Sequence, residues 1–567
     1  MTTRPTHASP SGGGPAPRST AVILDGTPPT PAAVVAVARH DAPVHLDAAA
    51  RIRIDAGRAV VEHLADQDRP AYGVSTGFGA LATRSIPPER RVQLQRSLIR
   101  SHAAGSGPEV EREVVRAMML LRLRTLATGH TGVRAEVADL LAGLLNASLT
   151  PVVHEYGSLG CSGDLAPLAH VALALLGEGE VRDAEGVRRP ATEALAAAGL
   201  APVELQAKEG LALINGTDGM LGMLVLATHD LAMLLKVADV AAAMSIEALL
   251  GSDRVLAADL QALRPQPGQA VAAANLRRLL DGSPIVASHR TPDCTRVQDA
   301  YSLRCAPQVH GAARDTLDHA RRVAGYELAS TIDNPVVTTD GRIESNGNFH
   351  GAPVGYVLDF LAIAVADVAS MAERRTDRFL DVARNQDLPA FLADDPGVDS
   401  GLMIAQYTQA AIVSECKRLA APASVDSIPS SAMQEDHVSM GWSAARKLRR
   451  ALDGLTRVLA IEVVTAARAL DLRAPLTPAA GTGAARTALR TVVAGPGPDR
   501  WLAPELEAAT ELVRSGALLA AVEGSREIGF AVIATTLVLV SVFLPISFIQ
   551  GNIGRLFREF GVAVAAA

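Results

Sequence analysis

The sequence predicts a mainly α-helical protein, and two observations carry this prediction. Residues 204–263, 354–388 and 438–474 contain no proline and carry apolar residues at three- and four-residue spacing, which is typical of long helices. The 567 residues are 49% apolar and 20% charged, a composition typical of a globular chain rather than a disordered one. We therefore expect a bundle of long helices in the second half of the chain.

Residues 220–250 illustrate this pattern. Their polar positions His229, Lys236 and Asp239 fall near one face of a helix, while leucine and valine occupy the rest. Such a narrow polar stripe predicts a bundle helix that is buried over most of its circumference.

The chain divides into four segments. Residues 1–21 are rich in Pro, Gly, Ser and Thr and predict a disordered tail. Residues 22–219 alternate short apolar runs with Gly- and Pro-containing turns and predict an N-terminal domain, whereas residues 220–523 carry the long helices. Residues 524–567 differ in kind, because residues 529–549 hold no charge and are long enough to cross a bilayer. A membrane helix and a buried C-terminal helix both fit that stretch.

Composition and cysteine spacing exclude several classes of protein. A net charge of −7 without a basic domain, and only 2 Trp, 6 Tyr and 10 Phe, do not fit a nucleic-acid binder. Cys161, Cys294, Cys305 and Cys416 are widely spaced, with no CxxC pair, so neither a disulfide scaffold nor a zinc site is expected. No phosphate-binding or dinucleotide-binding motif occurs. We expect a cytoplasmic protein that needs neither metal nor nucleotide.

The segment Gly157-Ser-Leu-Gly-Cys-Ser-Gly-Asp164 is the most unusual in the chain. Gly163 has no Cβ, so its amide nitrogen could approach the Cys161 carbonyl and close a five-membered ring. Loss of water from Ser162 would then leave an electrophilic methylidene group. The alternative is an ordinary Gly-rich turn before a helix capped by Asp164, and these residues alone leave both interpretations open.

The same segment, extended to residue 170 as GSLGCSGDLAPLAH, resembles the signature of the aromatic amino-acid ammonia-lyases. Further matches follow in the family's order over about residues 22–523. They are YGVSTGFG at Tyr72, SHAAG at Ser101, KEGLALINGT at Lys208, VQDAYSLRCAPQVHG at Val297, DNPVV at Asp333, GNFHG starting two residues before Phe349, and QEDHVSMG at Gln434. The resemblance implies an N-terminal domain bearing the cofactor, followed by a long-helix bundle, in a homotetramer.

The resemblance also implies a methylidene-imidazolone (MIO) cofactor made from Cys161, Ser162 and Gly163, although alanine is usual at position 161. Ser162 would supply the carbon that takes the substrate amine, and Tyr72 would remove the β-proton. Arg304 would bind the substrate carboxylate in a two-pronged fork. The remaining family positions lie near the cofactor or line the substrate pocket: Asn215 and Tyr301, and His102, Gln298, Phe349, Glu415 and Glu435.

Three features resemble the members of the family that deaminate L-histidine to trans-urocanate and ammonia: Ser101-His102, Ser414-Glu415 and the SxxQEDHVSM segment at 431–440. Because an imidazole presents one donor and one acceptor, a pocket with His102 and Glu415 could satisfy both, whereas a phenyl ring would leave them unpaired. A tyrosine or phenylalanine lyase or aminomutase is the alternative. Taken singly, Gln298 and Glu435 could be surface residues, Phe349 a core residue, and Glu415 part of a solvated helix face.

One segment departs from this family. Residues 524–567 resemble a short internal piece of the resistance-nodulation-division efflux pumps, which a gene fusion, a misassembled reading frame or a tail anchor would explain. A genuine anchor would contact a membrane through residues 529–549.

Two hypotheses from other classes of protein remain open. One is a thiol hydrolase with Cys161 as nucleophile and His102 or His170 as base, and the other is a non-catalytic membrane-associated protein.

Overall fold

The computed structural model describes residues 20–65, 72–160, 163–291, 294 and 297–525. Described segments are mostly helical, which confirms the predicted fold class, and the strands are short. Apart from Thr20 and Ala21, the predicted tail 1–21 lies outside the described residues, as does the apolar stretch 529–549.

The chain forms two compact units that are interleaved in sequence. Unit 1 comprises Met1–His229, His319–Phe360 and Pro422–Arg449, and unit 2 comprises Asp230–Asp318, Leu361–Ala421 and Arg450–Ala567. Because these units are interleaved, they do not correspond to the two sequence segments that meet at residue 219, and the domain boundary expected there stays a prediction. Four long helices contribute residues to both units: α9 (Asp218–Ala248), α14 (Ala306–Ala329), α15 (Ala352–Leu380) and α17 (Gly441–Leu472).

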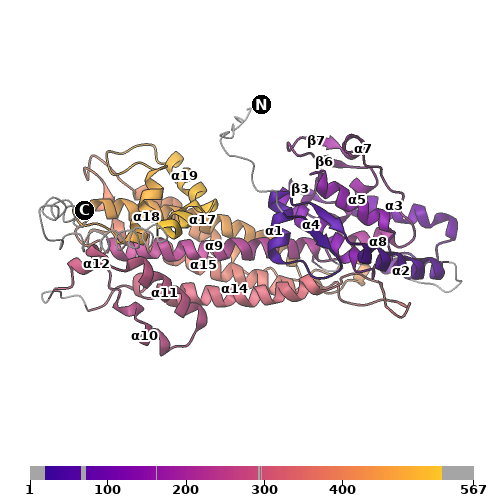
Figure 1. Cartoon of the computed structure of the whole chain (residues 1–567), viewed down its shortest axis with the longest axis horizontal. Coiled ribbons are helices and arrows are strands. Elements are labelled where there is room, and N and C mark those ends of the chain that lie inside the picture. Colours follow the sequence, from indigo (N-terminus) through magenta and orange to yellow (C-terminus); the bar gives the residue numbers. More distant parts are fainter. Residues whose placement is uncertain (1–19, 66–71, 161–162, 292–293, 295–296, 526–567) are drawn as a thin grey trace, which may run out of the picture. The chain divides into compact units, whose positions relative to one another are not determined.

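Unit 1 is built around α4, which is buried along most of its length and packs against α1, α2 and α5 (Figure 1). A second group, α3, α6 and α8, packs together and carries several predicted site residues. The helices of this unit are α1 (Pro31–His40), α2 (Ala48–Ala65), α3 (Arg91–His102), α4 (Arg112–Ala127), α5 (Ala135–Asn146), α6 (Leu165–Leu175), α7 (Ala191–Ala197) and α8 (Glu209–Ile214).

Unit 1 also contains four small sheets of two or three short strands each, which do not form a continuous layer. Only the first pair is parallel. The pairs are β1 (Val22–Leu24) with β2 (Val44–Leu46), β3 (Ser106–Glu109) with β5 (His154–Tyr156), β4 (Thr150–Pro151) with β6 (Glu180–Arg182), β6 with β7 (Arg188–Pro190), and β8 (Val336–Val337) with β9 (Ile343–Glu344).

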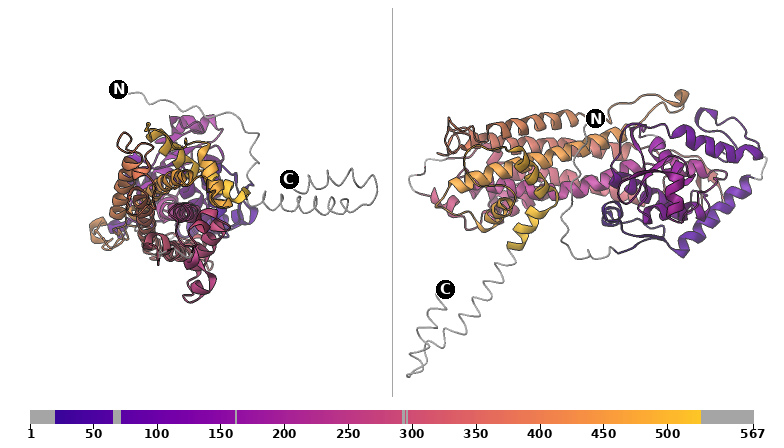
Figure 2. Two further views of the ribbon diagram at one scale, coloured as in Figure 1. Left: turned by 90° about the vertical axis from the view of Figure 1, so that its left-hand side faces the viewer. Right: turned by 90° about the horizontal axis from the view of Figure 1, so that it is seen from above.

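In unit 2, its portions of α9, α15 and α17 run side by side (Figures 1 and 2). Glu462 joins them: Arg375 donates to its carboxylate at 2.5 Å and Ser245 donates at 2.7 Å, all inside the core. A buried carboxylate needs such partners to remain charged. The other helices of this unit are α10 (Ala258–Ala262), α11 (Pro267–Leu280), α12 (Pro284–Ser288), α13 (Tyr301–Arg304), α16 (Met403–Leu419), α18 (Ala480–Arg490) and α19 (Ala503–Arg514).

The long helices expected within residues 354–388 and 438–474 are confirmed as α15 and α17. Residues 204–263 are also largely helical, but as separate elements, since α8 ends at Ile214 and α9 runs from Asp218 to Ala248. The break falls at Gly216, whose backbone lies so close to Gly163 that a continuous helix with side chains would not fit.

The helix predicted over residues 220–250 is nearly buried, as expected, but its polar positions do not share one environment. His229 and Lys236 are exposed, whereas Asp239 is buried. Its carboxylate hydrogen-bonds His310 at 2.9 Å and accepts from Arg314 at 2.6 Å. Helical spacing alone could not reveal partners on another helix.

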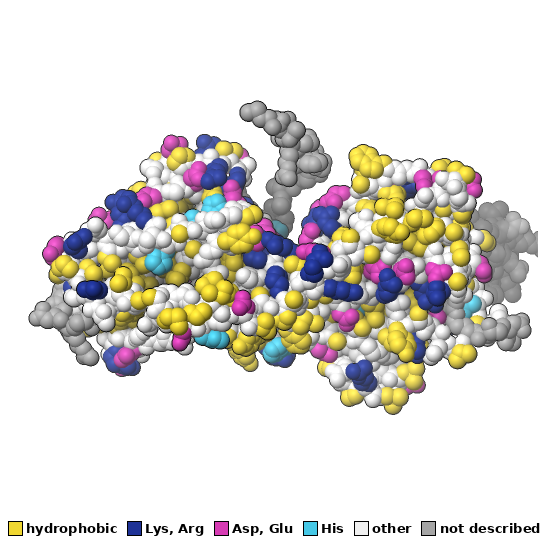
Figure 3. Space-filling view, turned by 180° about the vertical axis from the view of Figure 1, so that it is seen from behind, with side chains coloured by type: hydrophobic (Ala, Val, Ile, Leu, Met, Phe, Trp, Pro, Cys, Tyr) yellow, Lys and Arg dark blue, Asp and Glu magenta, His cyan; other side chains and the backbone are white. Residues whose placement is uncertain are grey.

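By length and composition, the segments Glu209–Ala248 and Ala352–Leu380 could each cross a membrane, but 72% and 61% of their apolar windows are buried, as is usual for core helices. On the face shown in Figure 3, lysine and arginine side chains are interspersed with aspartate and glutamate.

Candidate active site

The Gly-rich loop before α6 is held by Asp164, a fully buried carboxylate. Ser158 Oγ donates to it at 2.8 Å, and the Met220 N–H at the start of α9 donates at 2.9 Å. Burial raises the pKa of Asp164 to about 7, against the effect of these hydrogen bonds. Asp164 stands at the N-cap position of α6 but makes no side-chain capping bond there. Its carboxylate instead joins the loop to α9.

Gly163 occupies a position where no other residue fits. Its φ is +79°, and a Cβ would lie 2.2–2.4 Å from the backbone O, N and C atoms of Gly216. The next residue, Asp164, donates its N–H to the Gly216 carbonyl at 2.6 Å. Cys161 and Ser162 lie outside the described residues. The requirement for glycine at the third position of the triplet is consistent with the ring closure that the sequence suggests.

Asn215 ends α8 immediately before this contact. Its side chain is 3% exposed, and Nδ2 donates to the Asn334 carbonyl at 2.8 Å. Oδ1 has no hydrogen-bond partner among the described residues. Because a buried acceptor without a partner is costly, this atom is suited to bind a group that forms or enters at the neighbouring triplet.

Tyr72 lies on a loop that packs against the segment bearing Glu435. The Gly79 N–H donates to the phenol oxygen at 3.2 Å. The 3₁₀ turn Gly79–Leu81 packs against the turn Ser431–Met433, and a Cβ on Gly79 would lie 2.8 Å from Ser431 Oγ. Tyr72 and the QEDH segment are therefore neighbours in unit 1.

His102, the last residue of α3, lies within electrostatic range of Glu435. Its Nδ1 is 2.9 Å from the Leu98 carbonyl, which can only accept, so Nε2 of the neutral ring is left as an acceptor. Burial lowers the pKa of His102, while the Leu98 carbonyl and the charge of Glu435 act in the opposite direction. Glu435 is therefore the carboxylate that the structure places near His102.

His170 secures the loop that follows His102. The Gly105 N–H donates to His170 Nε2 at 3.1 Å, and burial, followed by the charge of His154, lowers the pKa of His170 to about 4. A neutral imidazole engaged by a backbone donor has no free acceptor for a thiol. This contact disfavours His170 as the base of a thiol hydrolase.

In unit 2, the Arg304 guanidinium lies over the Tyr301 ring, 4.8 Å from its centroid. Arg304 Nε is buried and has no hydrogen-bond partner among the described residues, and the guanidinium has no carboxylate partner there. Tyr301 is 70% exposed, and Gln298 is exposed as well. A flat guanidinium held by an aromatic ring and lacking a protein carboxylate is suited to bind a substrate carboxylate.

The other two predicted pocket residues have ordinary surroundings. Glu415 is exposed on α16 and forms an ion pair with Arg418, three residues later, as in the solvated alternative considered for it. Phe349 is half-buried, and the next residue, His350, stacks on His437 with ring centroids 5.7 Å apart. The Phe349 loop therefore lies beside the QEDH segment.

The predicted site residues fall into two groups. Unit 1 holds Tyr72, His102, Gly163, Asn215, Phe349 and Glu435, and unit 2 holds Gln298, Tyr301, Arg304 and Glu415. Two polar pairs were not identified from the sequence: Asp164 with Met220, and Lys208 with Asp333. The KEGLALINGT and DNPVV motifs were the available signals for the second pair, since each contains one of its members.

The fold and the similarity to known enzymes identify a carbon–nitrogen lyase. The chain belongs to the aromatic amino acid lyase family, whose model matches residues 30–491. Histidine ammonia-lyase of Streptomyces griseus is 66% identical over 505 residues, which cover 88% of this chain and 98% of that enzyme.

Two solved structures are similar along most of the chain. Tyrosine aminomutase from Streptomyces globisporus has a TM-score of 0.85 at 38% identity and covers 89% of this chain and 99% of its own. Histidine ammonia-lyase from Trypanosoma cruzi has a TM-score of 0.82 at 38% identity, with 89% and 96% covered. A separate model, of the AcrB/AcrD/AcrF family, matches residues 505–567, in agreement with the efflux-pump resemblance seen in the sequence.

Proposed function

We propose that this chain is a histidine ammonia-lyase, which converts L-histidine to trans-urocanate and ammonia without oxidation. The observation that carries the proposal is that Glu435 lies near enough to His102 to act on it electrostatically, because an imidazole and a carboxylate offer a substrate imidazole complementary hydrogen-bonding groups that a phenyl ring cannot use. The identity to the Streptomyces griseus enzyme supports the same substrate.

The cofactor proposed for the site is MIO, formed from Cys161, Ser162 and Gly163. When formed, MIO supplies an electrophilic carbon to which a substrate amine can add. The residues around the triplet fit such a group, since Gly163 must be glycine and Asn215 Oδ1 lacks a partner among the described residues. Metal and nucleotide are not required by this chemistry.

The chain's own residues would bind and orient the substrate. Arg304 binds the carboxylate, and His102 with Glu435 binds the imidazole. Tyr72 receives the β-proton at its phenol oxygen, to which Gly79 already donates. The remaining proposed pocket residues are Gln298, Tyr301, Phe349 and Glu415.

We propose a homotetramer for the functional assembly and the cytoplasm for its location. In the family, the active site is assembled at a subunit junction, and the long helices α9, α14, α15 and α17 suit the central bundle of such an assembly.

The proposed activity is tested with purified protein and L-histidine. We expect an absorbing conjugated acrylate and an equal amount of ammonia, and an intact mass lower than the translated sequence by two waters. L-tyrosine and L-phenylalanine serve as controls and should react far more slowly. An unmodified mass together with unchanged histidine would refute the proposal, whereas a β-amino acid product would identify an aminomutase, the alternative suggested by the similarity to tyrosine aminomutase.

Removal of residues 524–567 should leave histidine turnover within about twofold of the full chain, a margin comparable to the effect of a neutral surface change. The lyase family's match ends at residue 491, and the described packing ends with Leu518, Leu519 and Val522. Turnover and thermal unfolding of both chains are the measurements. A truncated chain that folds normally yet loses turnover would show that the C-terminal segment takes part in the activity.

A further inference from the structure

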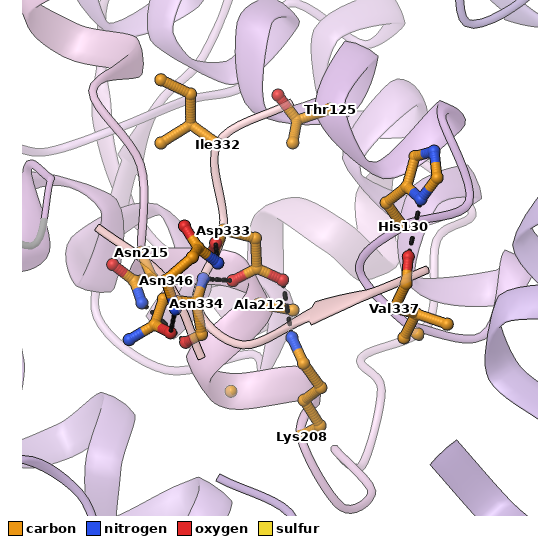
Figure 4. Close-up of polar contacts among 12 residues, drawn as sticks. Thr125, His130, Lys208, Ala212, Asn215, Ile332, Asp333, Asn334, Val337 and Asn346 are labelled. Atoms are coloured by element: carbon orange, nitrogen blue, oxygen red, sulfur yellow. Dashed lines mark hydrogen bonds and ion pairs between the residues drawn. The ribbon is translucent and has the colours of Figure 1, made fainter. Parts of the chain in front are cut away.

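The short helix α8 is tied at both ends to the same dipeptide, Asp333-Asn334 (Figure 4). At its N-cap, Lys208 Nζ donates to Asp333 Oδ2 at 2.6 Å. At its C-cap, Asn215 Nδ2 donates to the Asn334 carbonyl at 2.8 Å. One dipeptide therefore fixes the two ends of a six-residue helix.

The Lys208–Asp333 pair lies in the core of unit 1. Both side chains are 0% exposed, and Lys208 adopts a left-handed backbone conformation with φ +71°. Burial lowers the pKa of Lys208 and raises the pKa of Asp333, and the attraction between the two charges opposes both shifts. A buried ion pair in this setting contributes little net stability compared with an apolar pair. The strained backbone of Lys208 and the desolvated charges of the pair indicate that it positions neighbouring groups rather than stabilises the fold.

The dipeptide itself has little freedom to move. Asp333 Oδ1 accepts from the Asn334 N–H at 2.8 Å, and the Asp333 carbonyl accepts from Asn346 Nδ2 at 3.0 Å. Asn334 Oδ1 accepts from the Asn346 N–H at 2.9 Å and from Ser345 Oγ at 3.0 Å. The Asn334 carbonyl is thus presented to Asn215 from a fixed position.

This arrangement determines which atom of Asn215 remains available. With Nδ2 engaged by Asn334, Oδ1 is the buried acceptor without a partner among the described residues. The following residue, Gly216, accepts from the Asp164 N–H and lies against Gly163. A substitution at Asp333 or Lys208 would therefore shift Asn334 and, with it, the Asn215 side chain next to the triplet.

We propose that Lys208 and Asp333 form a positioning pair that orients the Asn215 side chain for the lyase reaction, acting through the Asn334 carbonyl. The proposal rests on the proposed function and deepens it. Neither Lys208 nor Asp333 needs to touch substrate or cofactor.

A double-mutant cycle tests this coupling. We expect Asn215→Ala and Asp333→Asn each to lower kcat about 10²-fold, with KM changed less than about threefold, because a preorganised polar group acts mainly in the transition state. When combined, the two changes should lower kcat no more than Asn215→Ala alone, since residues that act as one unit are not additive. Lys208→Met combined with Asp333→Asn removes both charges together and gives a second variant without an unpaired buried charge.

Glu209→Gln is the matched control. Glu209 lies on the same helix, is equally buried and pairs with Arg134 at 2.8 Å, and its described hydrogen bonds go to Arg134 and Gln206 rather than to Asn215. We expect its kcat to stay within about threefold of the parent, and its effect to multiply with that of Asn215→Ala. If the pair were purely structural, Asp333→Asn and Glu209→Gln would lower kcat equally at equal thermal stability. Alternatively, the effect of each change on kcat would multiply with that of Asn215→Ala. Either result overturns the proposal.

The intact mass of each variant provides a readout independent of turnover. We expect every variant to have lost two waters, so that the fall in kcat reflects orientation of Asn215. A chain of Asp333→Asn with unmodified mass would show that the pair acts on ring formation and would overturn the assignment to Asn215. Failure of the proposed function is distinguishable, because it shows in the parent protein as unreacted histidine before any variant is compared.

Discussion

Replacing Ser162 with alanine should lower kcat for histidine by at least about 10³-fold, because covalent catalysis through the triplet needs the hydroxyl that leaves as water. Alanine can contribute to a ring through its backbone but cannot form the exocyclic methylidene group. The intact mass should then fail to show the loss of two waters, and the substrate should still bind through Arg304. Turnover, intact mass and histidine binding measured on one preparation check these expectations together.

Cys161→Ala is the natural comparison for this experiment. Only the backbone of residue 161 would enter the ring, and alanine is the residue usual in the family, so most turnover should remain. A thiol hydrolase would give the opposite ranking, since its nucleophile is the Cys161 sulfur. Loss of activity in Cys161→Ala with retention in Ser162→Ala would therefore move the protein to another class of enzyme.

The helical architecture was predictable because hydrophobic spacing is a local property of the sequence. The segments that form α15 and α17 carry apolar residues at helical spacing, and proline occurs only in the first turn of α15, at Pro353. The break between α8 and α9 was not predictable from spacing, since its cause is the approach of Gly216 to Gly163 from more than fifty residues away. Asp239 shows the same limit, because its partner His310 lies on another helix.

The site residues were identified through motifs, and motifs do not say which side chains meet. Sequence reasoning paired His102 with Glu415, whereas the structure places Glu435 within electrostatic range of His102 and Arg418 beside Glu415. The participation of Glu415 in substrate binding stays a prediction. Asp164 was considered as a helix cap, yet its carboxylate binds the start of α9. Long-range hydrogen bonds of this kind have no signature in residue spacing.

Arg304→Lys should lower kcat/KM for histidine about 10²- to 10³-fold. Arg304 lies over the Tyr301 ring and has no carboxylate partner among the described residues, so its planar fork is free to bind a substrate carboxylate through two hydrogen bonds. Lysine keeps the charge but offers neither the fork nor the flat surface for stacking. Steady-state kinetics with L-histidine measures the loss, and Arg342→Lys, at an exposed arginine paired with Asp340, should change it less than about twofold.

Two inhibitors separate carboxylate binding from a general disturbance of the site. Imidazolepropionate keeps the carboxylate of the substrate, so its inhibition constant should rise in Arg304→Lys by about the same factor as kcat/KM falls. Histamine lacks the carboxylate, and its inhibition constant should stay within about threefold of the parent value. Equal weakening of both inhibitors would mean that Arg304 supports the fold of α13 rather than the substrate. Because lysine preserves the charge, this comparison isolates the geometry of the guanidinium as the source of the effect.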